Sequence, residues 1–145
     1  MGPWMKFELS KIEAAADQLD WAIRLFLDHK AYAAAITLAG AAEELIGKPL
    51  QDRAAFKQLT LTLSALSGLG PKSVTQEHLN KAKNWLKHWD DHADQDRIEL
   101  ELDEEAIQYI VRALTNFATY DSSSPSEGPR FWDWLQKNRP ELFAG

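Results

Sequence analysis

The sequence predicts an all-α fold, a single helical bundle of about five main helices followed by a short C-terminal helix. Apolar side chains recur at three- and four-residue steps through most of the chain, and helix start and stop signals bracket these segments. No two segments alternate well enough to pair as strands. A chain of 145 residues has the usual length of one domain, so we expect a single domain over residues 1–145 with its core at about 10–120.

The first helix is predicted over residues 10–30. Ser10 stands at its start and Glu13 follows three residues later, a pair whose side chains can satisfy the free amides of a helix start. One apolar stripe then follows at helical spacing: Ile12, Ala15, Leu19, Ala22, Ile23 and Phe26. This stripe predicts the face that the helix buries.

The second helix is predicted over residues 31–49, where Gly47 and Pro49 indicate its end. Its apolar side carries Tyr32, Ile36, Ala39, Ala42 and Ile46. Its alanines and Gly40 permit close approach of a neighbouring helix.

Residues 52–71 fit two patterns. Leu59, Leu61 and Leu63 alternate as in a strand, whereas another set follows helical spacing: Phe56, Leu59, Leu63 and Leu66. We predict a helix, because the sequence offers no second strand of similar quality with which this one could pair.

The fourth and fifth helices are predicted over residues 73–89 and 104–120. Ser73 with Gln76 can cap the fourth helix, and Asp103 the fifth. The expected buried faces are Leu79, Ala82, Trp85, Leu86 and Trp89 in the fourth, and Ile107, Ile110, Val111, Leu114 and Phe117 in the fifth.

The end of the chain is less regular. Residues 121–130 are rich in serine and proline, and we expect a mobile surface loop there. A short aromatic helix is predicted over residues 131–138. Its tryptophans are expected to anchor the core or an interface.

Composition narrows the function. The chain has no cysteine and no apolar run near the ~18 residues of a membrane-spanning helix, so we expect a cytoplasmic protein with no membrane partner and no cofactor. The formal net charge of −6 disfavours non-specific binding of nucleic acid. A role with RNA or a nucleotide therefore requires a local basic patch.

The stretch "KNWLKHWDDHADQD" concentrates the chemically versatile side chains. On a continued helix, His88 and His92 would aim both imidazoles at one ion, with Asp91 or Asp96 as a third ligand. The alternative, which we favour, is a hydrated loop that leaves the helix. No metal site is therefore expected.

The fourth helix also has a polar side, made by four residues at helical spacing: Asn80, Lys81, Asn84 and His88. Lys83 and Lys87 lie farther round the helix. The cations can hold a phosphate, and His88 can move a proton near neutral pH. Two His88 side chains facing each other in a dimer could act as base and acid in RNA cleavage. Alternatively, His88 merely ends the helix, where the dipole favours a cation, and the lysines are a solvated face.

Arg112 and Asn116 lie four residues apart on the fifth helix and could reach this polar side if the two helices are neighbours. The guanidinium fork of Arg112 suits a phosphate. Arg112 could equally pair within its own helix, with Glu105 or Gln108.

The segment "KAYAAAITLAGAAEELIGK", followed by a later helix with "KNWLKH", resembles the HEPN group of all-helical prokaryotic domains. Together, "NWLKH", "RALTNF" and "FWDWLQKNRPEL" resemble a set of uncharacterised bacterial proteins with this layout. The resemblance implies a homodimer whose facing motifs cleave RNA without metal. Lys83 stands where the group carries arginine, Asn84 at its polar position and His88 at its histidine. Lysine lacks the planar fork of arginine.

An acidic residue on the second helix contributes to the site in some HEPN members. Glu43 or Glu44 could take this place and line a polar pocket, or both could be surface charges. The expected catalytic residues are His88, Asn84 and Lys83, and the expected phosphate ligands are Lys81, Lys87, Arg112 and Asn116. The alternative is a non-catalytic interaction or scaffold protein, which would bind a protein partner or a second copy through its Ser-rich loop and aromatic helix. A minor alternative is metal binding through His88, His92 and the neighbouring aspartates.

Overall fold

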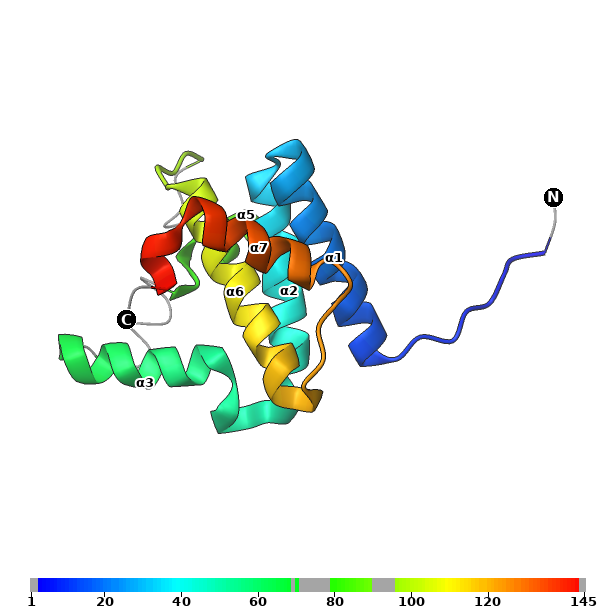
Figure 1. Cartoon of the computed structure of the whole chain (residues 1–145), viewed down its shortest axis with the longest axis horizontal. Helices are drawn as coiled ribbons and strands as arrows, with labels where there is room; N and C mark the ends of the chain where they lie inside the picture. The colour runs from blue at the N-terminus through cyan, green and yellow to red at the C-terminus, as the bar shows by residue number, and fades with distance from the viewer. Residues whose placement is uncertain (1–2, 69, 71–78, 90–95, 144–145) are drawn as a thin grey trace.

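The computed structural model in Figure 1 describes residues 3–68, 70, 79–89 and 96–143. Every regular element in these ranges is a helix, which confirms the predicted all-α class. No helix within them is both long and apolar enough to cross a membrane.

Three long helices form the centre of the molecule: α1 (Lys11–His29), α2 (Tyr32–Leu50) and α6 (Leu102–Asp121). α2 lies between the other two and packs along both (Figure 1). Ser10 caps α1 as predicted, since its Oγ accepts a hydrogen bond of 3.0 Å from the amide of Glu13. The buried side chains of α1 and α6 include most of the predicted stripes. These three helices therefore follow the local sequence signals closely.

The end of α2 differs slightly from the prediction. The helix continues through Pro49 to Leu50, a difference of the size expected at helix ends. It stops at Gln51, whose φ is 52° and whose amide bonds to the carbonyls of Gly47 and Lys48. A short 3-10 helix, η1 (Gln51–Arg53), then turns the chain towards α3.

The ambiguous segment is a helix, α3 (Ala55–Ser67), as predicted. Its apolar face, however, is not buried in the bundle. α3 extends away from the central helices (Figure 1), and Thr60 is its one buried residue. Leu61 and Leu66 are exposed. The periodicity thus identifies the helix correctly, but it does not predict whether another element packs on its apolar face.

The fourth predicted helix is much shorter in the described residues, where α5 covers Lys81–Lys87. Ser73 and Gln76 lie outside the described residues. Asn80 is the N-cap, with φ −116° and ψ 10°, and His88 has extended backbone, with φ −123° and ψ 143°. The polar side expected from Asn80 to His88 therefore does not form, because its two ends lie outside the helix. Trp89 is exposed rather than part of the buried face.

The helix α7 (Gly128–Asn138) begins three residues earlier than predicted and is followed by η3 (Pro140–Phe143). α6 begins at Leu102 rather than after Asp103, a difference of the size expected at helix ends. The loop between them is shorter than the expected mobile loop and is fastened to α1. Asp20 accepts hydrogen bonds from the hydroxyl of Ser126, at 2.9 Å, and the amide of Glu127, at 2.8 Å.

Candidate ligand-binding site

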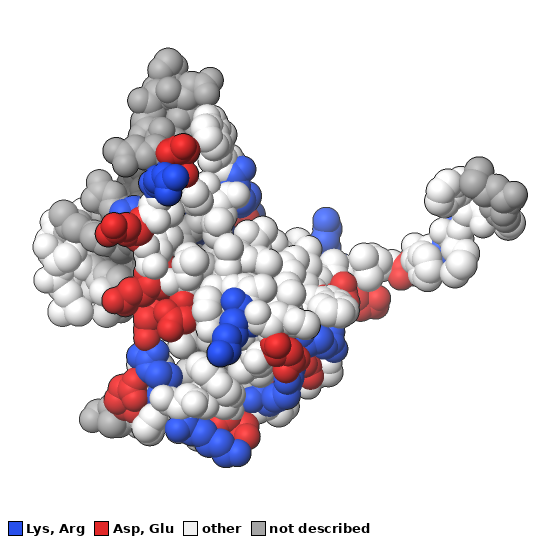
Figure 2. All heavy atoms as spheres, turned by 90° about the horizontal axis from the view of Figure 1, so that it is seen from above, with Lys and Arg blue, Asp and Glu red and all other residues white. Residues whose placement is uncertain are grey.

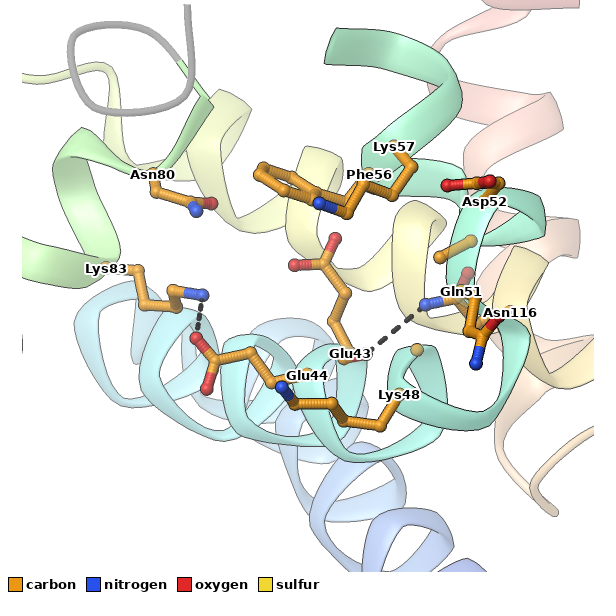
Figure 3. Close-up of a pocket in the computed structure, with 12 residues that line it drawn as sticks. Glu43, Glu44, Lys48, Gln51, Asp52, Phe56, Lys57, Asn80, Lys83 and Asn116 are labelled. Carbon is orange, nitrogen blue, oxygen red and sulfur yellow. Dashed lines mark hydrogen bonds and ion pairs between the residues drawn. The ribbon is translucent and has the colours of Figure 1, made fainter. Parts of the chain in front are cut away.

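A polar pocket of about 700 Å³ opens between α2, η1, α3 and α5 (Figure 3). Its lining combines charged, amide and aromatic side chains: Glu43, Glu44, Lys48, Gln51, Asp52, Phe56, Lys57, Asn80, Lys83 and Asn116. Pockets of this volume hold small ligands of nucleotide size. Glu43 and Glu44 of α2 therefore line a pocket, which was one of the two alternatives that the sequence left open for them.

Glu43, which lines this pocket, belongs to a buried ion pair with Arg112. Arg112 of α6 and Glu43 of α2 are each about 3% exposed, and Glu43 accepts from both Nε and Nη2 of the guanidinium. Nη1 donates to the carbonyl of Leu79 at 3.1 Å, and Nη2 to Oδ1 of Asn80 at 3.1 Å. The fork of Arg112 is thus used within the protein, where it joins α2, α6 and the start of α5. We assign it a positioning role instead of the expected phosphate contact.

Two further residues of α6 complete this internal network. Asn116 accepts from the amide of Ala55 at 2.8 Å and donates to the carbonyl of Glu43 at 3.3 Å. The hydroxyl of Tyr109 donates to the carbonyl of Leu79 at 2.9 Å and accepts from the amide of Lys83 at 3.2 Å. Burial raises the pKa of Tyr109 to about 12, which keeps the phenol protonated as a donor. Asn116 therefore also holds elements in place, in addition to lining the pocket.

The cations gather around Glu44 at the rim. The stem of Lys83 is buried and its Nζ lies 2.5 Å from Glu44. The hydrogen bond from Lys83 lowers the pKa of the Glu44 carboxyl, and the charges of Lys83, Lys87 and Lys48 lower it further. These three lysines, which we call the lysine cluster, surround a single carboxylate.

Gly40 makes room for the stem of Lys83. A Cβ atom at Gly40 would lie 2.5 Å from Cδ of Lys83, which is far closer than side chains tolerate. The small residue on α2 thus lets α5 approach closely enough for Lys83 to reach Glu44.

The other predicted site residues lie elsewhere. Lys81 is exposed and its charge acts on Glu105 of α6, and His88 is exposed after the end of α5. Neither is among the described residues that line the pocket. Asn84 is half-buried, and its carbonyl accepts from the amide of His88. The structure therefore groups Lys83 with Lys87 but does not bring His88 or Lys81 to them in one pocket.

The sequence-based prediction missed several lining residues, notably Lys48, Lys57 and Phe56. One signal was available for Lys48, which follows Glu44 by four residues and so shares its side of α2. Lys57 and Phe56 carried no such signal, because the turn at η1 brings them to the pocket.

The metal alternative falls largely outside the described residues, which exclude Asp91 and His92. Within the described residues, no three His, Asp or Glu side chains group closely enough to hold an ion.

Compared with known proteins, the chain matches no family model, no curated protein and no solved structure. The HEPN resemblance therefore stays a prediction. Any assignment of function rests on the geometry of the pocket.

Proposed function

We propose that the chain binds single-stranded RNA at the polar pocket and the adjoining lysine cluster, as a HEPN-like homodimeric domain. The observation that carries the proposal is the local excess of cations in an acidic chain. Four lysines line the pocket and the hollow beside it, against three carboxylates: Lys48, Lys57, Lys83 and Lys87 against Glu43, Glu44 and Asp52. With Glu43 and Glu44 already paired, Lys48, Lys57 and Lys87 remain against Asp52, and this excess supports a nucleic-acid role.

The ion pairs decide which cations remain for a ligand. Arg112 is neutralised by Glu43, and Lys83 by Glu44. Lys48, Lys57 and Lys87 are exposed at the rim. These three lysines are the expected phosphate contacts. Lys83, which pairs with Glu44, is instead assigned a positioning role that joins α5 to α2.

A second hollow, of about 420 Å³, lies on the other side of Glu44, between α1, α2 and α5. Its lining includes Gln18 and Lys87, and it shares Glu44 and Lys48 with the polar pocket. Lys48 thus lines both hollows, whereas Lys57 lines the polar pocket and Lys87 lines the second hollow. This arrangement suits a strand that crosses both hollows better than a single nucleotide.

Phe56 supports a nucleic-acid ligand over a simple anion. Its ring lines the pocket together with the amide side chain of Gln51 (Figure 3). Stacking of a base on an aromatic ring is worth about 1–3 kcal/mol and tolerates any sequence. A base beside Phe56, with its phosphates on the rim lysines, would therefore use both features of the site.

The proposal predicts a specific loss of binding when two rim lysines are removed. Lys48→Ala combined with Lys87→Ala is expected to weaken the binding of a fluorescein-labelled single-stranded RNA about tenfold or more, measured by anisotropy at 50 mM salt. The plot of log affinity against log salt should also become shallower by about 0.7 for each lysine lost.

The matched control is Lys11→Ala with Lys137→Ala, which removes two exposed lysines outside the two hollows. The control should bind like the unmodified protein. Equal affinities of the control and the rim variant would contradict the proposed site, and an unmodified protein that does not bind RNA would contradict the proposed function.

Cleavage is a separate expectation, which the HEPN resemblance supports. The resemblance implies that the protein cuts the same RNA in the presence of EDTA and that His88→Ala abolishes cleavage. Because His88 does not line the pocket, the variant is expected to bind RNA with unchanged affinity. Gel analysis of the labelled RNA checks this, and cleavage by His88→Ala at the original rate would remove His88 from the chemistry.

A further inference from the structure

The N-terminal arm, residues 3–9, leaves the body as an extended segment with no regular structure (Figures 1 and 2). Its four large apolar side chains are between 66% and 88% exposed: Trp4, Met5, Phe7 and Leu9. Successive side chains of an extended chain point to opposite sides, so Met5, Phe7 and Leu9 share one side. Trp4, Lys6 and Glu8 share the other. Such alternation is typical of an extended segment that buries one side, yet in this structure both sides of the arm are exposed.

An apolar groove of about 390 Å³ lies on another part of the molecule, between α3, α6, α7 and η3. Leu59 and Leu63 form the α3 wall, Val111 lies on α6, and Trp132 and Phe143 come from the last two elements. Leu59 and Phe143 are exposed. Exposed apolar surface of this kind marks an interaction site.

We infer that this groove receives the N-terminal arm of a second copy of the chain. The apolar side of the arm is exposed, and so are parts of the groove's apolar walls. Each surface could therefore bury the other. The arm starts at α1 and points away from α3 and the C-terminal end of the chain (Figure 1). Its own groove is therefore a poor target, whereas a neighbouring copy can present its groove to the arm.

Reciprocal exchange makes the interface large enough. An aromatic side chain buries about 150–250 Å², and Phe7 contributes this area together with Met5 and Leu9 on the same side of the arm. Two exchanged arms, with the groove surfaces that they cover, reach the ~1,200 Å² of the smaller stable interfaces. A two-fold axis supplies this arrangement and closes the assembly at two copies. The inference rests on the homodimer of the proposed function. The linings of the groove and of the polar pocket share no residue, although Arg112, the partner of Glu43, also lines the groove, so RNA binding and arm exchange can fail separately.

The absence of native cysteine permits a direct test by cross-linking. A Met5→Cys protein mixed with a Leu63→Cys protein is expected to give a disulfide-linked dimer on a non-reducing gel. The double variant with both substitutions in one chain should also give linked dimers. A linked monomer instead would mean that the arm folds onto its own groove, which overturns the inference. The control pairs Met5→Cys with Asp17→Cys, an exposed position on α1, and equal cross-linking there would likewise overturn it.

Light scattering supplies the second measurement. The unmodified protein is expected to scatter with the mass of a dimer, and Phe7→Asp or Leu63→Asp should lower this mass to that of a monomer. Both sites lie outside the buried core, so circular dichroism should confirm that the variants stay folded. Glu8→Ser, on the opposite side of the arm, should remain a dimer. A monomeric unmodified chain, or a dimer that survives Phe7→Asp, would overturn the inference.

Discussion

Replacing Arg112 by alanine is expected to lower the free energy of unfolding by about 3–5 kcal/mol, because it leaves the buried carboxylate of Glu43 without its partner. The guanidinium also serves the carbonyl of Leu79 and the side chain of Asn80. The loss therefore affects the packing of α6 on α2 and the start of α5 together. Urea unfolding followed by circular dichroism measures the change.

The partner substitution and the pair test the same interaction. Glu43→Gln is also expected to destabilise, because it leaves the cation of Arg112 buried without an opposite charge. Arg112→Met combined with Glu43→Leu should recover much of the loss, since an apolar pair of similar volume avoids both uncompensated charges. Recovery will be partial, because Asn80 still loses its donor, although Leu79 keeps the hydroxyl of Tyr109.

The control for this cycle is Arg139→Ala. Arg139 also pairs with carboxylates, those of Glu104 and Glu141, but at the surface, where such pairs are worth about 0–1 kcal/mol. If Arg112→Ala lowers the free energy of unfolding no more than Arg139→Ala does, the buried pair contributes little to stability. Additive effects of Arg112→Met and Glu43→Leu would show that the two side chains do not act as a pair.

The central helices could be predicted from sequence because their signals are local. Ser10 caps the residue three positions later, and the stripe of α1 lies within one helix. α3 shows the limit of the same reasoning. Its leucine spacing identifies a helix, but periodicity describes a face and does not say whether another element covers it.

The site was less predictable because its contacts join distant parts of the chain. Glu43 and Arg112 are 69 residues apart, and no local pattern indicates that they meet. α5 depends on the same contacts, since the side chain of its N-cap, Asn80, is bound by Arg112. Helical spacing alone extended the predicted polar side to His88, where the backbone has already left the helix.

The C-terminal helix gives the second large expected effect. Phe131 of α7 is fully buried, with its ring 5.8 Å from that of Phe26 on α1 in an edge-to-face contact, and 6.1 Å from that of Trp134. Phe131→Ala removes these contacts and leaves a cavity, and such changes cost about 3–5 kcal/mol. For a chain of this length, we expect the melting temperature to fall by about 10–15 °C in a circular dichroism melt.

Gln136→Ala is the matched control, because Gln136 is exposed on the same helix and should change the melting temperature little. Trp132 and Leu135 of α7 line the apolar groove, so displacement of α7 should also weaken the arm-exchanged dimer. The polar pocket has no lining residue on α7, and RNA binding below the melting temperature should persist. If Phe131→Ala melts like Gln136→Ala, α7 is held by its surface ion pairs, such as Arg130 with Asp28, rather than by its aromatic contacts.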